Sequence, residues 1–144
     1  MMQRILAFDV GDKRIGVAVS DALGITAQPV ETYHRKGGAE KDAEYLLALA
    51  KKYAPCTLLF GLPRNMDGTY GEQAEKVKRF AQRIIDRWDG DYAFYDERLT
   101  TMAARRVLLD ADISREKRKQ VIDKMAAVVI LQGYMESQRN QKGS

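Results

Sequence analysis

The chain has 144 residues and a mass of 16.3 kDa, which is the size of one domain with one sizeable core. Its 45% hydrophobic and 31% charged residues exclude a chain that is disordered throughout, and the longest apolar run, residues 125–131, is too short for a membrane span. The net charge is +4 and the single cysteine excludes an intrachain disulfide, so we expect a cytoplasmic protein without a membrane partner.

The hydrophobic pattern predicts strands first and then alternating helices and strands. Residues 4–10 are apolar on both faces except at Asp9, which predicts a central strand. A turn and a second strand at 15–21 make an antiparallel hairpin, and a third strand follows at 25–34. Further along the chain we expect helices at 38–53, 69–88, 100–110 and 115–138 and strands at 56–61 and 92–96. The helix after residue 68 is predicted to open on a capping box of Thr69 and Glu72.

These elements predict an α/β fold with one mixed five-stranded sheet and helices on both faces. Three strands form an antiparallel meander, and right-handed crossovers place the two parallel strands on the far side of the first strand. We expect one domain over residues 1–138 and a polar tail at 139–144. Ligands of such sheets bind at the carboxyl ends of strands where the strand order reverses, and Asp9 occupies that point.

Three acidic positions lie where such a sheet could bring them together. Asp9 ends the first strand, Asp96 and Glu97 end the fifth, and Asp123 lies on the partly apolar stripe of the last helix. Each also has a purely structural explanation: a turn cap for Asp9, a helix cap or surface pair for Asp96 and Glu97, and an ion pair with Lys119 for Asp123. Together they predict a site for Mg²⁺ or Mn²⁺, because these hard cations prefer carboxylate oxygens. Such ions activate water in phosphodiester hydrolysis.

Four ordered blocks carry a family resemblance. They are residues 9–18 (DVGDKRIGVA), 61–69 (GLPRNMDGT), 96–101 (DERLTT) and 122–127 (IDKMAA). The chain resembles the YqgF/RuvX family of bacterial Holliday junction resolvases or pre-16S rRNA nucleases over essentially its whole length. The resemblance implies an RNase H-like fold, divalent-metal nuclease activity in the cytoplasm, and a catalytic and metal-binding triad of Asp9, Glu97 and Asp123. Many RNase H-like nucleases carry an acid after the fourth strand, whereas this chain has Gly61-Leu62-Pro63, so the number of ions stays open.

Basic residues beside these acids predict contacts with phosphates. Residues 98–144 carry 10 basic and 5 acidic side chains, a net charge of +5, whereas residues 1–97 carry 14 and 15, a net charge of −1. Cations at the start of the last helix oppose its dipole and so do not serve helix stability. The predicted substrate-binding set is Lys13, Arg14, Arg64, Asn65, Arg98, Arg115, Arg118 and Lys119. The alternatives are a solvated helix face for the last three and a pair with Asp96 for Arg98.

Other functions and features stay open at this stage. The Asp-x-Gly turn at Asp9 resembles the phosphate-binding loop of actin and hexokinase, but those proteins close two domains around a nucleotide and this chain has length for one. A non-catalytic RNA-binding or ribosome-assembly factor could also keep the acids. The nucleic acid, structured RNA or branched DNA, and the oligomeric state, monomer or homodimer, are undecided. We expect Cys56 to be a core thiol, and Trp88, Tyr92, Phe94 and Tyr95 to be core and strand residues rather than a base-stacking platform.

Overall fold

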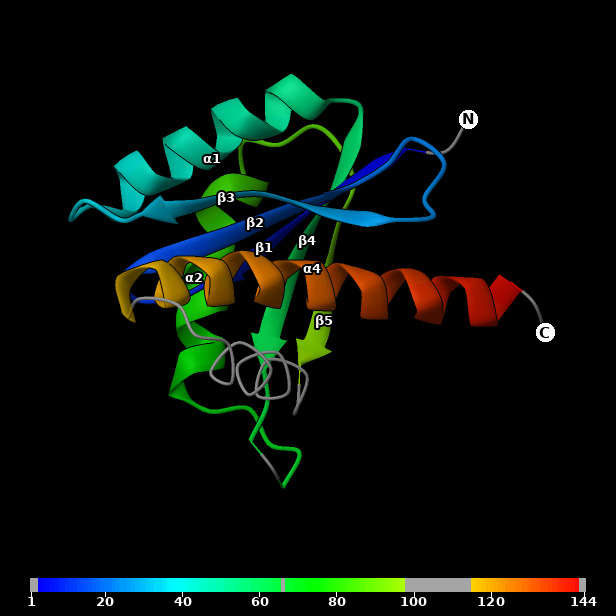
Figure 1. Cartoon of the computed structure of the whole chain (residues 1–144). Coiled ribbons are helices and arrows are strands. Elements are labelled where there is room, and N and C mark those ends of the chain that lie inside the picture. Colours follow the sequence, from blue (N-terminus) through cyan, green and yellow to red (C-terminus); the bar gives the residue numbers. More distant parts are fainter. Residues whose placement is uncertain (1–2, 66, 98–114, 143–144) are drawn as a thin grey trace.

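The computed structural model describes the backbone of residues 3–65, 67–97 and 115–142, and the side chains of all of these except 97, 115–124 and 140–142. A five-stranded sheet lies between helices on its two faces (Figure 1). The strands are β1 (Arg4–Val10), β2 (Arg14–Ser20), β3 (Ala27–His34), β4 (Cys56–Pro63) and β5 (Tyr92–Glu97). The helices are α1 (Ala39–Tyr53), α2 (Glu72–Ile85) and α4 (Arg115–Lys142). The helix expected at 100–110 lies outside the described residues.

The strand order confirms the predicted sheet. It is β3-β2-β1-β4-β5, with β1 in the centre. β2 is antiparallel to both β1 and β3, whereas β4 is parallel to β1 and β5 is parallel to β4. The carboxyl ends of β1, β4 and β5 therefore meet at one edge of the sheet. At that edge Leu62 pairs with Asp96 and Pro63 with Glu97.

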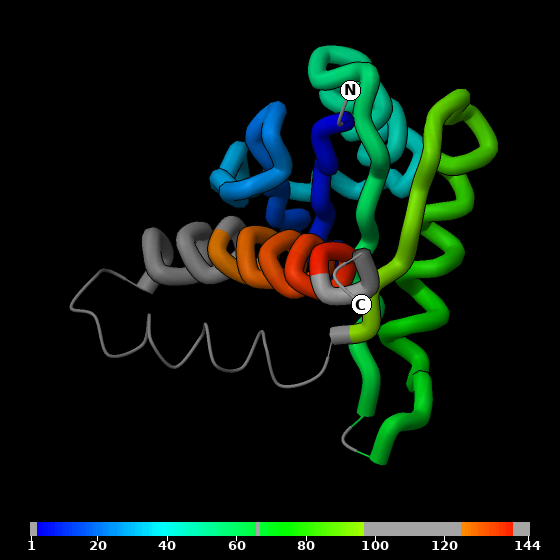
Figure 2. Tube along the Cα trace, turned by 90° about the vertical axis from the view of Figure 1, so that its right-hand side faces the viewer, coloured from blue at the N-terminus to red at the C-terminus, as the bar shows by residue number. Residues whose placement is uncertain are grey.

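Alternation along the strands divides the core into two layers. Leu6, Phe8 and Val10 of β1 belong to the core that α1 and α2 cover. Ala7 belongs to the core on the other face, which α4 covers with Ala127 and Ile130. Figure 2 shows α4 on one side of the sheet and α2 on the opposite side. The two faces of the sheet therefore carry separate core layers, and the carboxyl end of β1 is accessible to groups on either face.

Small residues let α4 lie close to the sheet. Ala7 and Ala18 meet Ala127 in this layer. A Cβ atom at Gly133 would lie 2.7 Å from the Tyr95 hydroxyl oxygen, so only glycine leaves room there for the tyrosine ring. The ring of Tyr95 also packs edge-on against Tyr134, with centroids 6.2 Å apart. This close packing fixes α4 against the strands that carry Asp9 and Glu97.

Several local expectations are wrong. α2 begins at Glu72 with Gly71 as its N-cap and no side-chain cap, and the Thr69 hydroxyl instead accepts a hydrogen bond from the Asn65 side chain and donates to Asp67 Oδ1 at 2.6 Å. The helix ends at Ile85 rather than near residue 88, and α4 continues past residue 138 to Lys142. None of the described helices is long and apolar enough to span a membrane.

The aromatic residues divide between core and surface. Trp88 and Tyr95 pack against the two cores as expected. Tyr92 and Phe94 are strand residues of β5 with 50% and 36% of their surfaces exposed, and the Phe94 ring packs against the buried Phe60 ring with centroids 5.6 Å apart. They alternate along β5, which is an edge strand of the sheet that the described residues form. Their exposure follows from the position of the strand, which local sequence does not encode.

Candidate functional site

Asp9 lies at the carboxyl end of the central strand. It is partly buried, it pairs with Gly16 of β2, and alternation places it on the α4 face of the sheet, two residues after Ala7. The turn that follows is closed by the Gly11 amide, which donates to the Arg14 carbonyl oxygen at 2.9 Å. A Cβ at Gly11 would lie 2.8 Å from that oxygen, so the tight turn requires glycine. The hairpin thereby holds Asp9 at a fixed position on the sheet edge.

The other two predicted acids lie on neighbouring elements. Glu97 is the last residue of β5, at the same sheet edge as Asp9. Asp123 is on α4, one turn before Ala127, which packs in the α4-facing core. The side chains of Glu97 and Asp123 are outside the described set, and among the side chains within it no three His, Cys, Asp or Glu residues are grouped to hold a metal ion. β4 ends in Leu62 and Pro63, without an acid.

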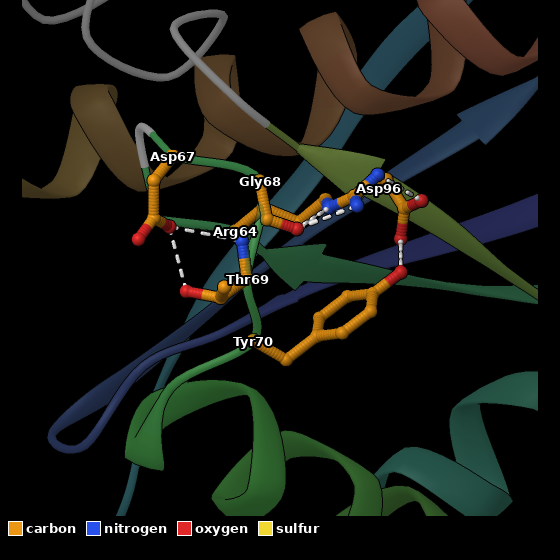
Figure 3. A network of polar contacts seen from close by, with 6 residues as sticks. All are labelled: Arg64, Asp67, Gly68, Thr69, Tyr70 and Asp96. Atoms are coloured by element: carbon orange, nitrogen blue, oxygen red, sulfur yellow. Dashed lines mark hydrogen bonds and ion pairs between the residues drawn. The ribbon is translucent and has the colours of Figure 1, made fainter.

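A polar network joins the end of β5 to the loop that connects β4 with α2 (Figure 3). The guanidinium of Arg64 donates to the Gly68 carbonyl oxygen through Nε at 2.9 Å and Nη2 at 2.5 Å, and through Nη1 to Asp96 Oδ2 at 3.2 Å. The Tyr70 hydroxyl donates to Asp96 Oδ1 at 2.6 Å. Asp96 therefore faces the α2 side of the sheet, and its hydrogen bonds to Arg64 and Tyr70 hold the end of β5 immediately before Glu97.

The same loop is closed by bonds among its own residues. The Asn65 amide nitrogen of the backbone donates to the Thr69 carbonyl at 2.8 Å, and the Asn65 side chain donates to the Thr69 hydroxyl at 3.0 Å. Gly68 adopts φ +90°, a conformation that favours glycine. Arg64 and Asn65 are thus both engaged in holding this loop, and their predicted contact with phosphates stays a prediction.

Lys13 and Arg14 lie at the β1–β2 turn, directly after Asp9 at the carboxyl end of β1. Their predicted contact with phosphates stays a prediction, and they line a cleft of about 720 Å³ between this turn, the start of α1 and one side of α2. We call it the α1–α2 cleft. Its cationic lining residues are Lys13, Arg14, Arg35, Lys76, Arg79 and Arg83, and its carboxylates are Asp12 and Asp42. The three α2 cations are not among the residues predicted from sequence, although their spacing of three and four residues places them on one helix face.

A buried ion pair forms one wall of this cleft. Asp42, 1% exposed, accepts hydrogen bonds from Arg35 Nε and from the Tyr33 hydroxyl, both at 2.8 Å. Arg35 also donates through Nη1 to the Gly11 carbonyl at 2.9 Å and stacks over the Phe80 ring, 4.7 Å from its centroid. Burial, together with the hydrogen bond to Asp42, raises the pKa of Tyr33 to about 12, so its hydroxyl stays a donor at neutral pH.

The other residues singled out in the sequence lie on α4, in the core and at the end of β3. Arg115, Arg118 and Lys119 lie in the first turns of α4, with side chains outside the described set, and Arg98 lies outside the described residues altogether. Cys56 is a buried core thiol, as expected, and burial raises its pKa to about 11. His34 is exposed at the end of β3 and lines the α1–α2 cleft.

Known proteins resemble this chain in sequence and in fold. Residues 3–137 match the family model RuvX, described as Holliday junction resolvase. A relative from Clostridioides difficile is 53% identical and one from Halalkalibacterium halodurans is 50% identical, over 95% and 94% of this chain and 96% and 98% of their own lengths. Both are named "Putative pre-16S rRNA nuclease".

The fold has a counterpart among solved structures. Thermus RuvC, titled "T. thermophilus RuvC in complex with Holliday junction substrate", aligns with a TM-score of 0.51 and 14% identity over 90% of this chain and 92% of that chain. This likeness supports the expected RNase H-like architecture of a central mixed sheet with helices on both faces. Since the family model and the relatives both span more than nine-tenths of the sequence, the chain belongs to the RuvX family of Holliday junction resolvases.

Proposed function

We propose that this protein is a nuclease that hydrolyses phosphodiester bonds in nucleic acid at the carboxyl edge of β1, β4 and β5. The observation that carries the proposal is the strand order, which brings the partly buried Asp9 and the end of β5 to one edge beneath α4. Desolvating a carboxylate there is costly unless a cation or a hydrogen-bonding partner compensates. The nuclease names of the relatives and the family description support the same activity.

We expect Asp9, Glu97 and Asp123 to converge on the α4 face. Ala93 and Tyr95 of β5 pack in the α4-facing core, so alternation predicts that Glu97 continues that face. Asp123 shares the helical stripe of Ala127, which packs in the same layer. Three carboxylates fit Mg²⁺ or Mn²⁺, which when bound would lower the pKa of a water molecule and neutralise charge on the phosphate. Because β4 ends without an acid, we expect fewer protein ligands than a four-carboxylate site offers.

Each residue of the proposed site then has a defined role. The triad carboxylates would hold the cation, which when bound would supply an activated water, and we expect the Gly11 turn and the Asp96 network to keep Asp9 and Glu97 in place. Arg98 and the cations Arg115, Arg118 and Lys119 are expected to contact phosphates that flank the cleavage position. Such contacts position the strand without selecting its sequence.

The names of the relatives favour precursor 16S rRNA as substrate, and the family description favours a four-way DNA junction. Both are branched or structured polyanions, and the chain offers cations to either. We expect the protein to act in the cytoplasm, as a monomer on RNA or as a homodimer where a junction is cut symmetrically. A panel of labelled four-way junctions, duplexes, single-stranded RNA and an rRNA 5′ leader, each with Mg²⁺ and with Mn²⁺, decides between these substrates.

The decisive experiment replaces Asp9 by Asn, which keeps size and removes charge. Cleavage should fall on the order of 10³-fold or more, with substrate affinity unchanged or tighter as repulsion of the phosphates is lost. Glu97→Gln and Asp123→Asn should behave alike, with losses that do not add. The matched control is Asp91→Asn, an exposed acid before β5 at the opposite end of the strand, which should cleave normally.

Two outcomes contradict the proposal. One is cleavage by the purified Asp9→Asn protein at the wild-type rate in Mg²⁺ or Mn²⁺, and the other is full wild-type activity in excess chelator. A wild-type protein that binds structured RNA tightly and cleaves none of the panel would be a binding factor in ribosome assembly.

A further inference from the structure

We propose that the α1–α2 cleft binds successive phosphodiester groups of the substrate strand, away from the phosphate that is cleaved. This inference rests on the proposed function in one respect only, that the ligand is a nucleic acid. The cleft opens on the α1 and α2 face of the sheet, whereas Asp9 lies on the α4 face, so the two surfaces are distinct. None of the α2 cations belongs to the predicted substrate-binding set.

The charge of the cleft exceeds what its own carboxylates neutralise. Six cationic side chains and two carboxylates line it, a net charge of +4. Arg35 is bonded to Asp42 at 2.8 Å, Lys76 lies 3.8 Å from Asp12, and Arg83 contacts Glu40 at 3.1 Å. Within the described part of the chain, Lys13 and Arg79 have no carboxylate partner. Cations gathered without anions repel one another, and a bound polyanion removes that repulsion.

The spacing of the cations favours a strand over a small ligand. Lys76, Arg79 and Arg83 follow one face of α2 over seven residues, a length of about 10 Å along the helix axis. A single phosphate group cannot contact a row of this length. Successive phosphates of an extended backbone can, and Lys13 and Arg14 lengthen the row at the β1–β2 turn.

The start of α1 adds donors to the same cleft. Gly37, Gly38 and Ala39 line it, and the N-cap residue Gly38 provides no side-chain hydrogen bond. The first backbone N–H groups of a helix have no partner within the helix and carry its positive dipole end. Glycine at these positions leaves the backbone open to a ligand, since a Cβ at Gly37 or Gly38 would have no neighbour within 4 Å.

The path to the catalytic edge is short. Val10 and Gly11 line the cleft and directly follow Asp9 in the chain. A strand that presents one phosphate to Asp9 can therefore cross the β1–β2 turn and continue along α2. The cleft would contribute affinity and direction to the strand while leaving the chemical step to the other face.

The test is the double variant Lys76→Gln and Arg79→Gln, matched with Lys51→Gln and Lys52→Gln. The control removes the same two charges from exposed positions in the last turn of α1, at the end of that helix opposite to the cleft. Affinity for a four-way junction and for an rRNA 5′ leader is measured from 0.05 to 0.5 M salt without divalent metal. The cleft variant should lose roughly 10- to 100-fold in affinity near 0.1 M salt, and the slope of log affinity against log salt should flatten by about 1.5 to 2. The control should change neither quantity.

Two further arms identify the ligand and the role. The single variant Arg79→Lys should keep most of the wild-type affinity, because a lysine ammonium group also binds phosphate. At saturating substrate with metal present, the cleft variant should cleave at the wild-type rate, which separates binding from chemistry. Pyrophosphate at millimolar concentration and fixed ionic strength should compete poorly with the strand.

The proposal is overturned if the cleft variant keeps the wild-type salt slope, or if pyrophosphate binds tightly and only that binding is lost in the variant. Because affinity is measured without metal, these results hold whether or not the protein cleaves. A wild-type protein that binds with the cleft-dependent slope and cleaves nothing would contradict the nuclease proposal alone.

Discussion

At the scale of single residues, the buried Asp42 of α1 links β3 to the β1–β2 turn through its hydrogen bonds. Its carboxylate, 1% exposed, accepts bonds from Tyr33 of β3 and from Arg35, and Arg35 reaches on to the Gly11 carbonyl beside Asp9. Asp42→Ala leaves the guanidinium of Arg35 without its counter-ion while the Arg35 side chain is only 19% exposed. We expect the free energy of unfolding to fall by about 3 kcal/mol, measured by urea denaturation.

The matched control is Tyr45→Phe. The Tyr45 hydroxyl donates to the Glu31 carboxylate at 2.8 Å, but Tyr45 is 42% exposed, so its loss should cost well under 1 kcal/mol. A difference between the two variants smaller than 0.5 kcal/mol on this scale would show that the Asp42 pair merely offsets its own desolvation.

At the scale of elements, the Asp96 network couples the loop before α2 to the end of β5. We expect Asp96 to act as a positioning residue for Glu97 through the strand, without touching substrate. Asp96→Asn should lower kcat by about tenfold and raise the Mg²⁺ concentration needed for half-maximal rate, with substrate affinity nearly unchanged, because a misplaced carboxylate weakens the metal site first. Its stability should change by less than about 1 kcal/mol, since the Asp96 pair is exposed.

The readouts distinguish positioning from general damage. Asp91→Asn changes the same residue type just before the other end of β5 and should leave both the rate and the metal requirement unaltered. A uniform loss of folded protein would lower the active fraction without moving the metal requirement. If Asp96→Asn lowered the active fraction and left the metal requirement unchanged, Asp96 would not be a positioning residue.

At the scale of the whole molecule, we expect nucleic acid to contact basic residues on opposite faces of one sheet. The α1–α2 cleft lies on one face, and α4, which begins with Arg115, Arg118 and Lys119, covers the other. Replacing these three by Gln should flatten the salt slope by about 2 to 3. Combining that change with the Lys76 and Arg79 changes should give additive losses of binding free energy within about 0.5 kcal/mol, because distant sites act independently. Losses well below additive would mean that both sets contact the same phosphates.

Much of this architecture follows from local pattern. The two-faced apolarity of residues 4–10 predicts the central strand, the short turn after Asp9 dictates an antiparallel hairpin, and right-handed crossovers determine where β4 and β5 join the sheet. The predicted capping box did not form because α2 begins only at Glu72 and the Thr69 hydroxyl oxygen accepts from the Asn65 side chain in the preceding loop, a competition that spacing alone does not resolve. The convergence of Asp9, Glu97 and Asp123 stays a prediction of that sheet and of the family resemblance.

The sequence by itself determined the order of strands, the acids at their ends and the family, because strand alternation, helical periodicity and ordered motifs are local properties of the chain. Only the tertiary structure decided which cations stand together. Lys13 and Arg14 line the same α1–α2 cleft as Lys76 and Arg79, which are more than sixty residues away in the chain. The sequence of the turn after β1 does not say which face of the sheet its side chains lie on. The packing of α2 on one face decides which cations of α2 lie near Lys13 and Arg14, because this proximity depends on distances through space.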